Sequence, residues 1–213
     1  DRPEVYYGEL TRSYVVVGGT VKEFDYPQGD QNVYANYEGT GGVSIGGLWH
    51  KLLFSWHFGD VEILLSNYIE KNSKVLFHRQ ILDRIEKLAP FLYYDSDPYL
   101  VLSEGRMVWV LDAYTVTDDI PYSEPVGTNK FNYIRNSVKV VVDAYNGSVD
   151  FFVSEDQDPL IQVYQQIFPK TFKSMDELPT DLLSHIRYPV DFFEIQSQMY
   201  RAYHMMDETV FYN

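Results

Sequence analysis

The sequence predicts an α+β fold, in which a mostly antiparallel sheet is built from two central β-hairpins and several helices pack against it. Two observations predict the hairpins. Runs rich in valine and phenylalanine flank Asn146-Gly147, and a second pair of apolar runs, residues 99–102 and 106–112, flanks Glu104-Gly105. A third observation predicts the helices, because several stretches combine apolar residues at helical spacing with a capping residue or a terminating proline.

Residues 132–159 are interpreted as a hairpin because Asn-Gly supplies the positive φ angles of a two-residue type I′ turn. With a turn of that length, Val142 faces Phe151 and Val140 faces Val153, which makes one face wholly apolar. We expect that face in the core and the other face against solvent or a polar layer.

The same register places Asp143 opposite Asp150, and like charges directly opposite each other destabilise a strand pair. Three explanations stay open, in this order. Water screens the two carboxylates, or a basic side chain such as Arg135 or Lys139 lies across them, or a cation binds between them.

Before the hairpins, residues 14–20 are typical of a buried strand, which we expect to join the central sheet, and residues 21–26 continue it past a glycine bulge. Residues 28–47 are rich in turn formers. Residues 48–58 then form a predicted helix that is apolar on most of its circumference. The glycines before it are expected to let this helix pack closely.

Ser73 is expected to cap a helix over residues 74–88, which Pro90 ends. The predicted buried stripe consists of Ile81, Leu82, Ile85, Leu88 and Ala89. His78 lies one turn before that stripe, on its apolar side. A hydrogen-bonded core histidine is therefore favoured there over a metal ligand.

Both runs of the second hairpin are apolar on two faces, so both strands are expected to be central in the sheet. After the first hairpin, Asp158 caps a predicted helix with Pro159 at its first position. A short helix is expected after Pro179, within residues 175–185. The last helix begins near Pro189 and has an amphipathic stripe made of Phe192, Ile195, Met199, Ala202 and Met206.

One glycine-rich segment allows a functional interpretation. Residues 42–46 match the Gly-x-Ser-x-Gly nucleophile elbow around Ser44, and a glycine loop before a helix can also hold an anion. The elbow, however, needs a strand that leads directly into the serine, and residues 37–41 are a poor strand. The phosphate loop needs a lysine where Leu48 stands. Close packing is favoured over both functions.

Two other groups are candidate cation or metal sites. Asp95 and Asp97 alternate as the first ligands of calcium loops do, but turn-capping aspartates before a proline are favoured. His50 and His57 are seven residues apart, and a metal would need both to converge across two helical turns. No residue is assigned a catalytic, cofactor-binding or metal-binding role.

Composition narrows the function classes. The net charge of −14 argues against binding to nucleic acid or to an anionic membrane surface. The absence of cysteine excludes disulfides, thiol catalysis and cysteine-ligated zinc, and no apolar run reaches the roughly 18 residues of a membrane span. One domain over residues 1–213 is favoured, with lobes 1–92 and 93–213 as the alternative. The abrupt start without methionine suggests a piece of a larger protein.

The chain resembles a known family over nearly its whole length. The most specific segment is residues 132–145, Asn-Tyr-Ile-Arg-Asn-Ser-Val-Lys-Val-Val-Val-Asp-Ala-Tyr. Further matching segments are residues 7–9, 23–27, 39–43, 89–92, 97–99, 112–115, 185–189 and 203–205. Together they are similar to uncharacterised protein family 0182, whose members are bacterial integral membrane proteins with several spanning helices followed by a large portion outside the membrane.

The resemblance implies that this chain is such a portion, outside the cytoplasm, in a multi-pass protein of the cell membrane. It implies no catalytic residue. We expect a non-enzymatic module for assembly, partner recognition or solute recognition, whose partners are its own transmembrane region and possibly other envelope proteins. The alternatives are a cell-envelope hydrolase or transferase that uses Ser44 or acidic residues, and a solute-binding module of a transporter.

Overall fold

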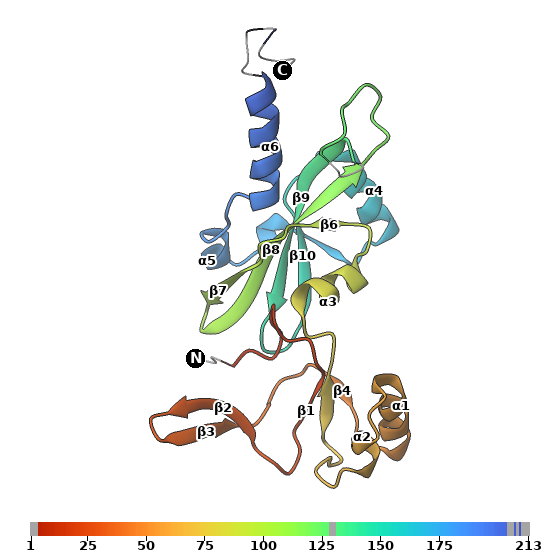
Figure 1. Cartoon of the computed structure of the whole chain (residues 1–213), viewed down its shortest axis with the longest axis vertical. Coiled ribbons are helices and arrows are strands. Elements are labelled where there is room, and N and C mark those ends of the chain that lie inside the picture. Colours follow the sequence, from red (N-terminus) through yellow and green to blue (C-terminus); the bar gives the residue numbers. More distant parts are fainter. Residues whose placement is uncertain (1–3, 128–130, 204–206, 208, 210–213) are drawn as a thin grey trace. The chain divides into compact units, whose positions relative to one another are not determined.

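The computed structural model describes residues 4–127, 131–203, 207 and 209 (Figure 1). The chain falls into two compact units: the first comprises residues 1–84 and 143–148, and the second comprises residues 85–142 and 149–213. Helices and antiparallel strand pairs occur in both, so the predicted α+β class is confirmed. No helix within the described ranges combines the length and the apolar character that are needed to cross a bilayer. The single domain over residues 1–213 stays a prediction.

The first unit contains two small sheets and three helices. Its strands are β1 (Val15–Val17), β2 (Glu23–Gln28), β3 (Gln31–Ala35), β4 (Val43–Ser44) and β5 (Lys74–Leu76). Its helices are α1 (Leu48–Phe58), α2 (Glu62–Leu65) and the first half of α3 (Ile81–Leu88), whose second half belongs to the second unit. β5 lies between β1 and β4 and pairs antiparallel with both, whereas β2 and β3 form a separate hairpin.

Several predictions for this region were wrong. The N-terminal strand does not join the large sheet, because Val15–Val17 pairs with residues 74–76, which were expected to start a helix. Val75 and Leu76 are fully buried, as a strand with partners on both sides requires. Ser73 does not cap α3. Its hydroxyl donates to the carbonyl of Gly18 at 3.0 Å and accepts from the amide of Glu70 at 2.8 Å, which ties the ends of β1 and β5 together.

β2 does not continue β1 past a bulge, because the chain turns at Gly18, whose φ of 67° is accessible to glycine at little cost. Instead, β2 pairs with β3, which lies in the segment that was predicted to be rich in turns. β3 begins with Gln31 and Asn32, both exposed, and these residues give no strand signal.

The first unit has two apolar clusters. One contains the buried residues Ile45, Ile63 and Val75, against which the partly buried Phe54 and Phe58 of α1 pack. The other contains Tyr7, Val17, Tyr37, Leu76 and Tyr145. In that second cluster, the rings of Tyr37 and Tyr145 stack with centroids 5.0 Å apart, so the turn at residues 143–148 is an integral part of the first unit.

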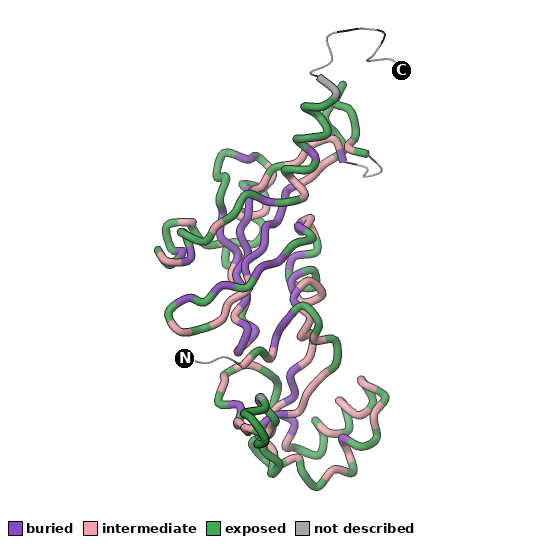
Figure 2. Tube along the Cα trace, turned by 60° about the vertical axis from the view of Figure 1, so that its left-hand side comes forward, coloured by how far each residue is buried: buried purple, intermediate pink, exposed green. Residues whose placement is uncertain are grey.

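The second unit is built on one sheet. Its strands are β6 (Tyr93–Tyr94), β7 (Tyr99–Ser103), β8 (Arg106–Thr117), β9 (Tyr133–Asp143), β10 (Val149–Val153) and β11 (Phe172–Ser174). The order is β11-β10-β9-β8-β6, and β7 pairs with the first part of β8. β11 runs parallel to β10, whereas β9 pairs antiparallel with β10, and β6 and β7 pair antiparallel with β8. Buried residues concentrate along β8, β9 and β10 (Figure 2).

The β9–β10 hairpin is confirmed, but its predicted register is wrong by two residues. Val142 pairs with Val149 and Val140 pairs with Phe151. The reason is the side chain of Asp143, whose Oδ1 accepts from the amides of Tyr145 and Asn146 at 2.8 and 2.7 Å. These bonds stabilise a longer turn over residues 144–147. Gly147 has a positive φ of 71°, but Asn146 does not, so the turn is not type I′.

A shift of two residues preserves which side chains share a face, so the apolar face formed by Val138, Val140 and Phe151 is buried as expected. The opposite face is also buried, because Val141 and Phe152 pack against Tyr99, Leu178 and neighbours. The predicted clash between Asp143 and Asp150 does not occur. Asp150 pairs with Val141 in the ladder and its Oδ1 lies 2.7 Å from Nζ of Lys173.

The second hairpin turns at Glu104-Gly105, as predicted, with Ser103 paired to Arg106 and positive φ angles of 48° at Glu104 and 74° at Gly105. β8 is central, as predicted. β7 is not, since it pairs only with β8, and its side chains alternate between buried and exposed. Leu100 and Leu102 are 41% and 66% exposed, because an apolar run alone does not distinguish an edge strand from a central one.

The remaining helices follow their capping signals. α4 (Pro159–Ile167) starts after Asp158, whose side chain accepts from the amides of Leu160 and Ile161. η1 (Met175–Glu177) and α5 (Thr180–Leu183) occupy the segment where a short helix was expected. α6 (Val190–Tyr203) begins after Pro189, as predicted, and buries Ile195. The predicted stripe also includes the side chain of Ala202, and Met206, both outside the described residues.

Candidate functional site

Helix α1 exposes apolar side chains that a surface helix normally buries. It begins after Gly47 and ends at Gly59, which has the left-handed φ of 67° that is common at helix ends. Its inner side contributes the partly buried Phe54 and Phe58 to the core. Its inner side also carries Lys51, whose Nζ donates to the carbonyls of Ser66 and Ile69 at 3.4 and 3.3 Å.

The outer side of α1 is hydrophobic and exposed. It consists of Leu48, Trp49, Leu52, Leu53 and Trp56, and we refer to these five residues as the Trp–Leu face. Trp49 is 78% exposed and Trp56 is 84% exposed, and no residue of the helix is fully buried. A solvated helix normally shows the opposite distribution. The predicted bounds of this helix are confirmed, but its predicted close packing is wrong.

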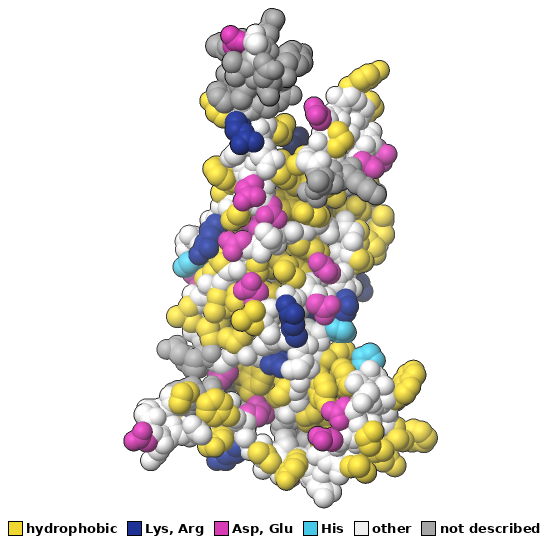
Figure 3. All heavy atoms as spheres, in the orientation of Figure 1, with side chains coloured by type: hydrophobic (Ala, Val, Ile, Leu, Met, Phe, Trp, Pro, Cys, Tyr) yellow, Lys and Arg dark blue, Asp and Glu magenta, His cyan; other side chains and the backbone are white. Residues whose placement is uncertain are grey.

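The segment that carries the Trp–Leu face contains no acidic residue. No aspartate or glutamate occurs between Glu38 and Asp60, although the chain contains 31 acidic residues. Figure 3 shows hydrophobic side chains gathered on the surface over α1. Exposed contiguous apolar surface of this kind marks interaction sites in monomeric proteins.

The first unit also contains a cavity of about 620 Å³ next to the inner side of α1. Its wall is aromatic. The ring of Tyr14 stacks on that of Phe58, with centroids 4.3 Å apart and planes 15° apart, and the ring of Phe77 lies 6.1 Å from that of Phe58. Arg12, Ser13, Arg79, His78 and Asp83 complete much of the lining.

His78 lies at this cavity, which we refer to as the His78 cavity, and not in the core, which corrects the sequence-based prediction. It precedes α3, its side chain is 38% exposed, and its Nδ1 lies 3.0 Å from Oδ2 of Asp83. Its backbone φ is 48°, an uncommon value for a residue with a Cβ. Arg84 holds this conformation, because its Nη1 donates to the carbonyl of His78 at 3.3 Å.

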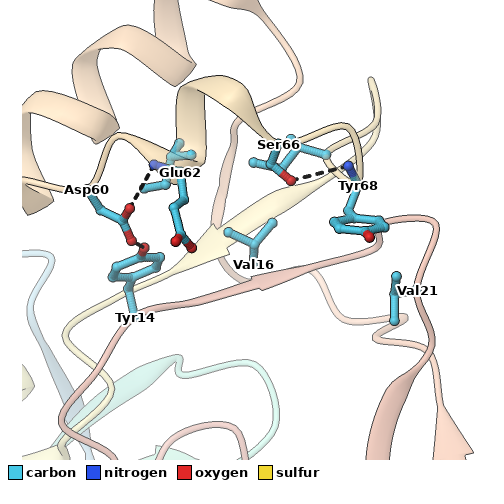
Figure 4. Close-up of a pocket in the computed structure, with 10 residues that line it drawn as sticks. Tyr14, Val16, Val21, Asp60, Glu62, Ser66 and Tyr68 are labelled. Atoms are coloured by element: carbon cyan, nitrogen blue, oxygen red, sulfur yellow. Dashed lines mark hydrogen bonds between the residues drawn. The ribbon is translucent and has the colours of Figure 1, made fainter.

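A smaller cavity of about 200 Å³ lies between β1 and α2 (Figure 4). Tyr14 contributes to both cavities. Its hydroxyl donates to Oδ2 of Asp60, whose other oxygen accepts from the amide of Glu62 at 2.9 Å. The bond from Tyr14 is the main cause that lowers the pKa of Asp60. Burial and the same bond raise the pKa of Tyr14 to about 12. This network fixes the Tyr14 ring between the two cavities.

Ser44 lies in a different place from any of these groups. It is an exposed residue of β4, opposite Lys74 in β5, and residues 45–47 separate it from α1. A nucleophile elbow instead requires the serine at the turn between strand and helix. The preceding glycines serve close packing, although not against α1. A Cβ on Gly41 would lie 2.2 Å from the carbonyl oxygen of Asn146.

The other predicted candidates are placed as follows. Asp95 is 2% exposed, and its carboxylate accepts from the hydroxyl of Tyr114 and from the amides of Asp97 and Asp191, so its oxygens have protein partners. His50 and His57 are both exposed on α1. Within the part of the chain that the structure describes, no group of three or more His, Asp or Glu side chains could hold a metal ion.

Polar groups buried in the second unit were not predicted as a cluster. Nζ of Lys139 bonds to Oδ1 of Asp112, and both side chains are about 95% buried, at 6% and 5% exposure. Asp158 accepts from the hydroxyls of Thr115, Tyr133 and Ser137 at 2.6, 2.6 and 2.8 Å. The one sequence signal for these buried interactions is the alternation of polar and apolar residues along β9, which includes Ser137 and Lys139.

A family model with the description Uncharacterised protein family (UPF0182) matches residues 1–213. The chain belongs to this family. The resemblance stated from the sequence motifs is thus confirmed. Among curated relatives, the UPF0182 protein of Pelotomaculum thermopropionicum is 54% identical over 212 residues, which are 100% of this chain and 23% of that protein.

Two further members of UPF0182 show the same proportions. The UPF0182 protein of Synechococcus sp. strain JA-3-3Ab is 50% identical over 213 residues, 100% of this chain and 25% of that protein. The UPF0182 protein of Alkaliphilus metalliredigens is 50% identical over 212 residues, 100% of this chain and 23% of that protein. The chain therefore spans about a quarter of the length of the curated relatives it matches. No solved structure matches it.

Neither the exposure of the Trp–Leu face nor the presence of the His78 cavity was predicted from the sequence. For α1 a signal existed, because a helix that is apolar around most of its circumference and contains no acid has more apolar surface than one contact can cover. For His78 no signal existed, since the sign of a backbone angle at a non-glycine residue is set by its tertiary contacts.

Proposed function

We propose that this chain is a non-enzymatic assembly module of a bacterial integral membrane protein, outside the cytoplasm, and that it docks through the Trp–Leu face onto the transmembrane region of its own longer protein. The exposed Trp–Leu face is the observation that carries the proposal. Two indoles at 78% and 84% exposure favour a covered state over contact with water.

The size of the relatives supports an intramolecular partner. In the three relatives described above, about three quarters of the protein lies outside the matched segment. A partner encoded in the same chain is present at high effective concentration, so a small apolar face is enough for docking. Half-covering one indole removes roughly 100 Å² from water, which contributes about 2–3 kcal/mol.

The test places a photo-crosslinking amino acid at Leu53 in the full-length membrane protein, with a matched probe at Leu102, which is 66% exposed on β7. We expect crosslinks from position 53 to map to a segment outside these 213 residues of the same protein molecule, and none from position 102. The double variant Trp49→Ser/Trp56→Ser should reduce crosslinking at position 53, whereas Leu102→Ser should not.

Crosslinks from position 53 that reach only a second copy, only another protein or only lipid would overturn the intramolecular docking. So would unchanged crosslinking in the Trp49→Ser/Trp56→Ser variant while circular dichroism shows that the protein is folded.

A hydrolase is the second candidate, because the His78 cavity includes Ser13, His78 and Asp83 in one lining. The imidazole is oriented by Asp83, as a general base is in a serine hydrolase. However, none of the hydrogen bonds found among the described residues joins the Ser13 hydroxyl to His78, and Ser13 is exposed. Labelling of Ser13 or Ser44 by a fluorophosphonate probe would favour the enzyme, and the assembly module predicts no labelling of either.

A further inference from the structure

The His78 cavity has the size and the wall of a site for a small organic molecule. Its volume of about 620 Å³ falls within the usual range of ligand sites, about 300–1,000 Å³. The stacked rings of Tyr14 and Phe58, together with Phe77, present flat apolar surfaces. Such surfaces favour a planar ring, because offset stacking and edge contacts add to the burial of apolar area.

The polar part of the lining favours an anionic group on that ring. Arg12 and Arg79 both line the cavity. Arg79 is anchored, since its Nε donates to the carbonyl of Tyr6 at 2.6 Å and its Nη1 donates to the carbonyl of Ser13 at 3.1 Å. Arg12 is exposed, and its guanidinium can form a bidentate pair with a carboxylate. Two guanidinium groups and one carboxylate, that of Asp83, line the cavity, so basic groups outnumber acidic ones there although the chain has a net charge of −14.

His78 adds a directed hydrogen-bonding atom. Nδ1 of His78 lies 3.0 Å from Oδ2 of Asp83, and an ionised carboxylate can only accept. In the tautomer in which Nδ1 donates to Asp83, Nε2 presents its lone pair as an acceptor. The backbone φ of His78 is positive, a feature that it shares with two other non-glycine residues among those the structure describes, Glu104 and Tyr122. Backbone strain held at a cavity by a neighbouring residue, here Arg84, is typical of a functional position.

We propose that this cavity binds a small aromatic carboxylate whose ring carries a hydroxyl or N–H donor. The carboxylate pairs with Arg12, the ring lies against Phe58 and Phe77, and the ring donor bonds to Nε2 of His78. This inference goes beyond the docking role of the Trp–Leu face and does not depend on it.

The test is isothermal titration calorimetry of the full chain with one reference probe and three probes that lack its ring hydroxyl, its carboxylate or its whole hydroxylated ring. They are 4-hydroxyphenylacetate, phenylacetate, 2-(4-hydroxyphenyl)ethanol and acetate. We expect 4-hydroxyphenylacetate to bind most tightly. Loss of the ring hydroxyl should weaken binding about threefold to tenfold, loss of the charge should weaken it at least about tenfold, and acetate should not bind measurably.

Two variants assign these preferences to residues. His78→Gly should abolish the preference for the hydroxylated ring while the thermal midpoint without ligand stays equal or rises, because glycine adopts a φ of 48° without strain. Arg12→Ala should abolish the preference for the carboxylate over the alcohol. The matched controls are Glu104→Gly, which relieves the same φ of 48° in the second unit, and Arg106→Ala, which removes an exposed arginine there.

The proposal is overturned if 4-hydroxyphenylacetate does not bind at millimolar concentration, or if the acid and the alcohol bind equally. It is also overturned if His78→Gly and Arg12→Ala leave both preferences intact. Arg12 is exposed, so its variant decides the outcome even if His78→Gly does not fold.

Discussion

At the scale of single residues, the second unit buries three aspartates, and each has its charge compensated in a different way. Asp95 accepts from a tyrosine hydroxyl and two backbone amides, Asp112 pairs with Lys139, and Asp158 accepts from three hydroxyls and two amides. An uncompensated buried carboxylate would be strongly destabilising. These three groups are therefore sensitive points of the second unit.

Replacing Lys139 by Met should lower the free energy of unfolding by about 3–5 kcal/mol at pH 7, because it leaves Asp112 buried without its partner. Burial already raises the pKa of Asp112. A carboxyl whose folded pKa lies above its unfolded value destabilises the fold as the pH rises above the unfolded value. The loss in Lys139→Met should therefore shrink as the pH is lowered from 7 towards 4, as urea denaturation at several pH values can measure.

The control for this prediction is Lys139→Met combined with Asp112→Leu, which removes both charges from the interior. It should recover much of the stability, since well-packed apolar pairs often replace buried ion pairs at little cost. A double variant that is less stable than Lys139→Met would show that the pair contributes mainly through packing.

Asp158 should make stability depend on pH in the opposite direction. Burial alone would raise its pKa, but the hydrogen bonds from Thr115, Tyr133 and Ser137 together lower it below the ordinary value of 3.8. Stability from such a group is present above the unfolded pKa and is lost as the pH falls through the folded one. Asp158→Asn should cost about 1–3 kcal/mol at neutral pH.

That cost should decline as the pH falls below about 4, where the unfolded carboxyl of the unsubstituted chain binds a proton. Denaturant titrations between pH 7 and 3 measure the difference. A cost that is constant over this range would show that the carboxylate is not preferentially ionised in the folded chain. Asparagine remains a good helix cap, so the loss of the α4 cap adds little to the effect.

At the scale of elements, the β9–β10 hairpin shows how a side chain can set a register. Asn-Gly correctly indicated the turn, but the hydrogen bonds that the amides of Tyr145 and Asn146 donate to Asp143 favour a longer loop than the dipeptide does. The prediction of which side chains share a face of the sheet is still correct, because a shift of two residues leaves every side chain on the same face.

Asp143→Ala should therefore destabilise the chain by about 1 kcal/mol, because it removes the acceptor of two turn amides. Asp150→Ala should change stability by less than about 0.5 kcal/mol, because its ion pair with Lys173 is 42–44% exposed. Thermal denaturation of the two single variants compares them directly. Stabilisation by both would instead support the register in which the two carboxylates face each other.

The helices could be predicted to different degrees. The bounds of α1 follow from the flanking glycines, and the start of α4 follows from Asp158 and Pro159, because caps are local signals. The exposure of the apolar side chains of α1 could not be predicted, because the sequence of a helix does not determine which other segments pack against it. The segment 74–88 failed for a related reason. Lys74–Leu76 has apolar residues that suit either a buried strand or a helix, and β1 and β4 decide between them.

At the scale of the whole molecule, the fold class and the two hairpins could be predicted from the sequence, but the grouping of the elements could not. The prediction of one large sheet joined to the N-terminal strand failed because strand pairing between distant segments depends on loop closure and packing. The cavity at His78 could not be predicted for the same reason, since it forms where residues from three separate stretches of the first unit meet.

The division of the chain between the units has a consequence for synthesis on the ribosome. The first unit includes residues 143–148, which contribute Tyr145 to the cluster around Tyr37. The carbonyl of Ala144 in the same segment accepts hydrogen bonds from the amides of Tyr6 and Tyr7. A nascent polypeptide that ends at residue 84 lacks these groups. The N-terminal unit therefore cannot complete its native packing until the later hairpin has emerged from the exit tunnel, and vectorial folding must wait for it.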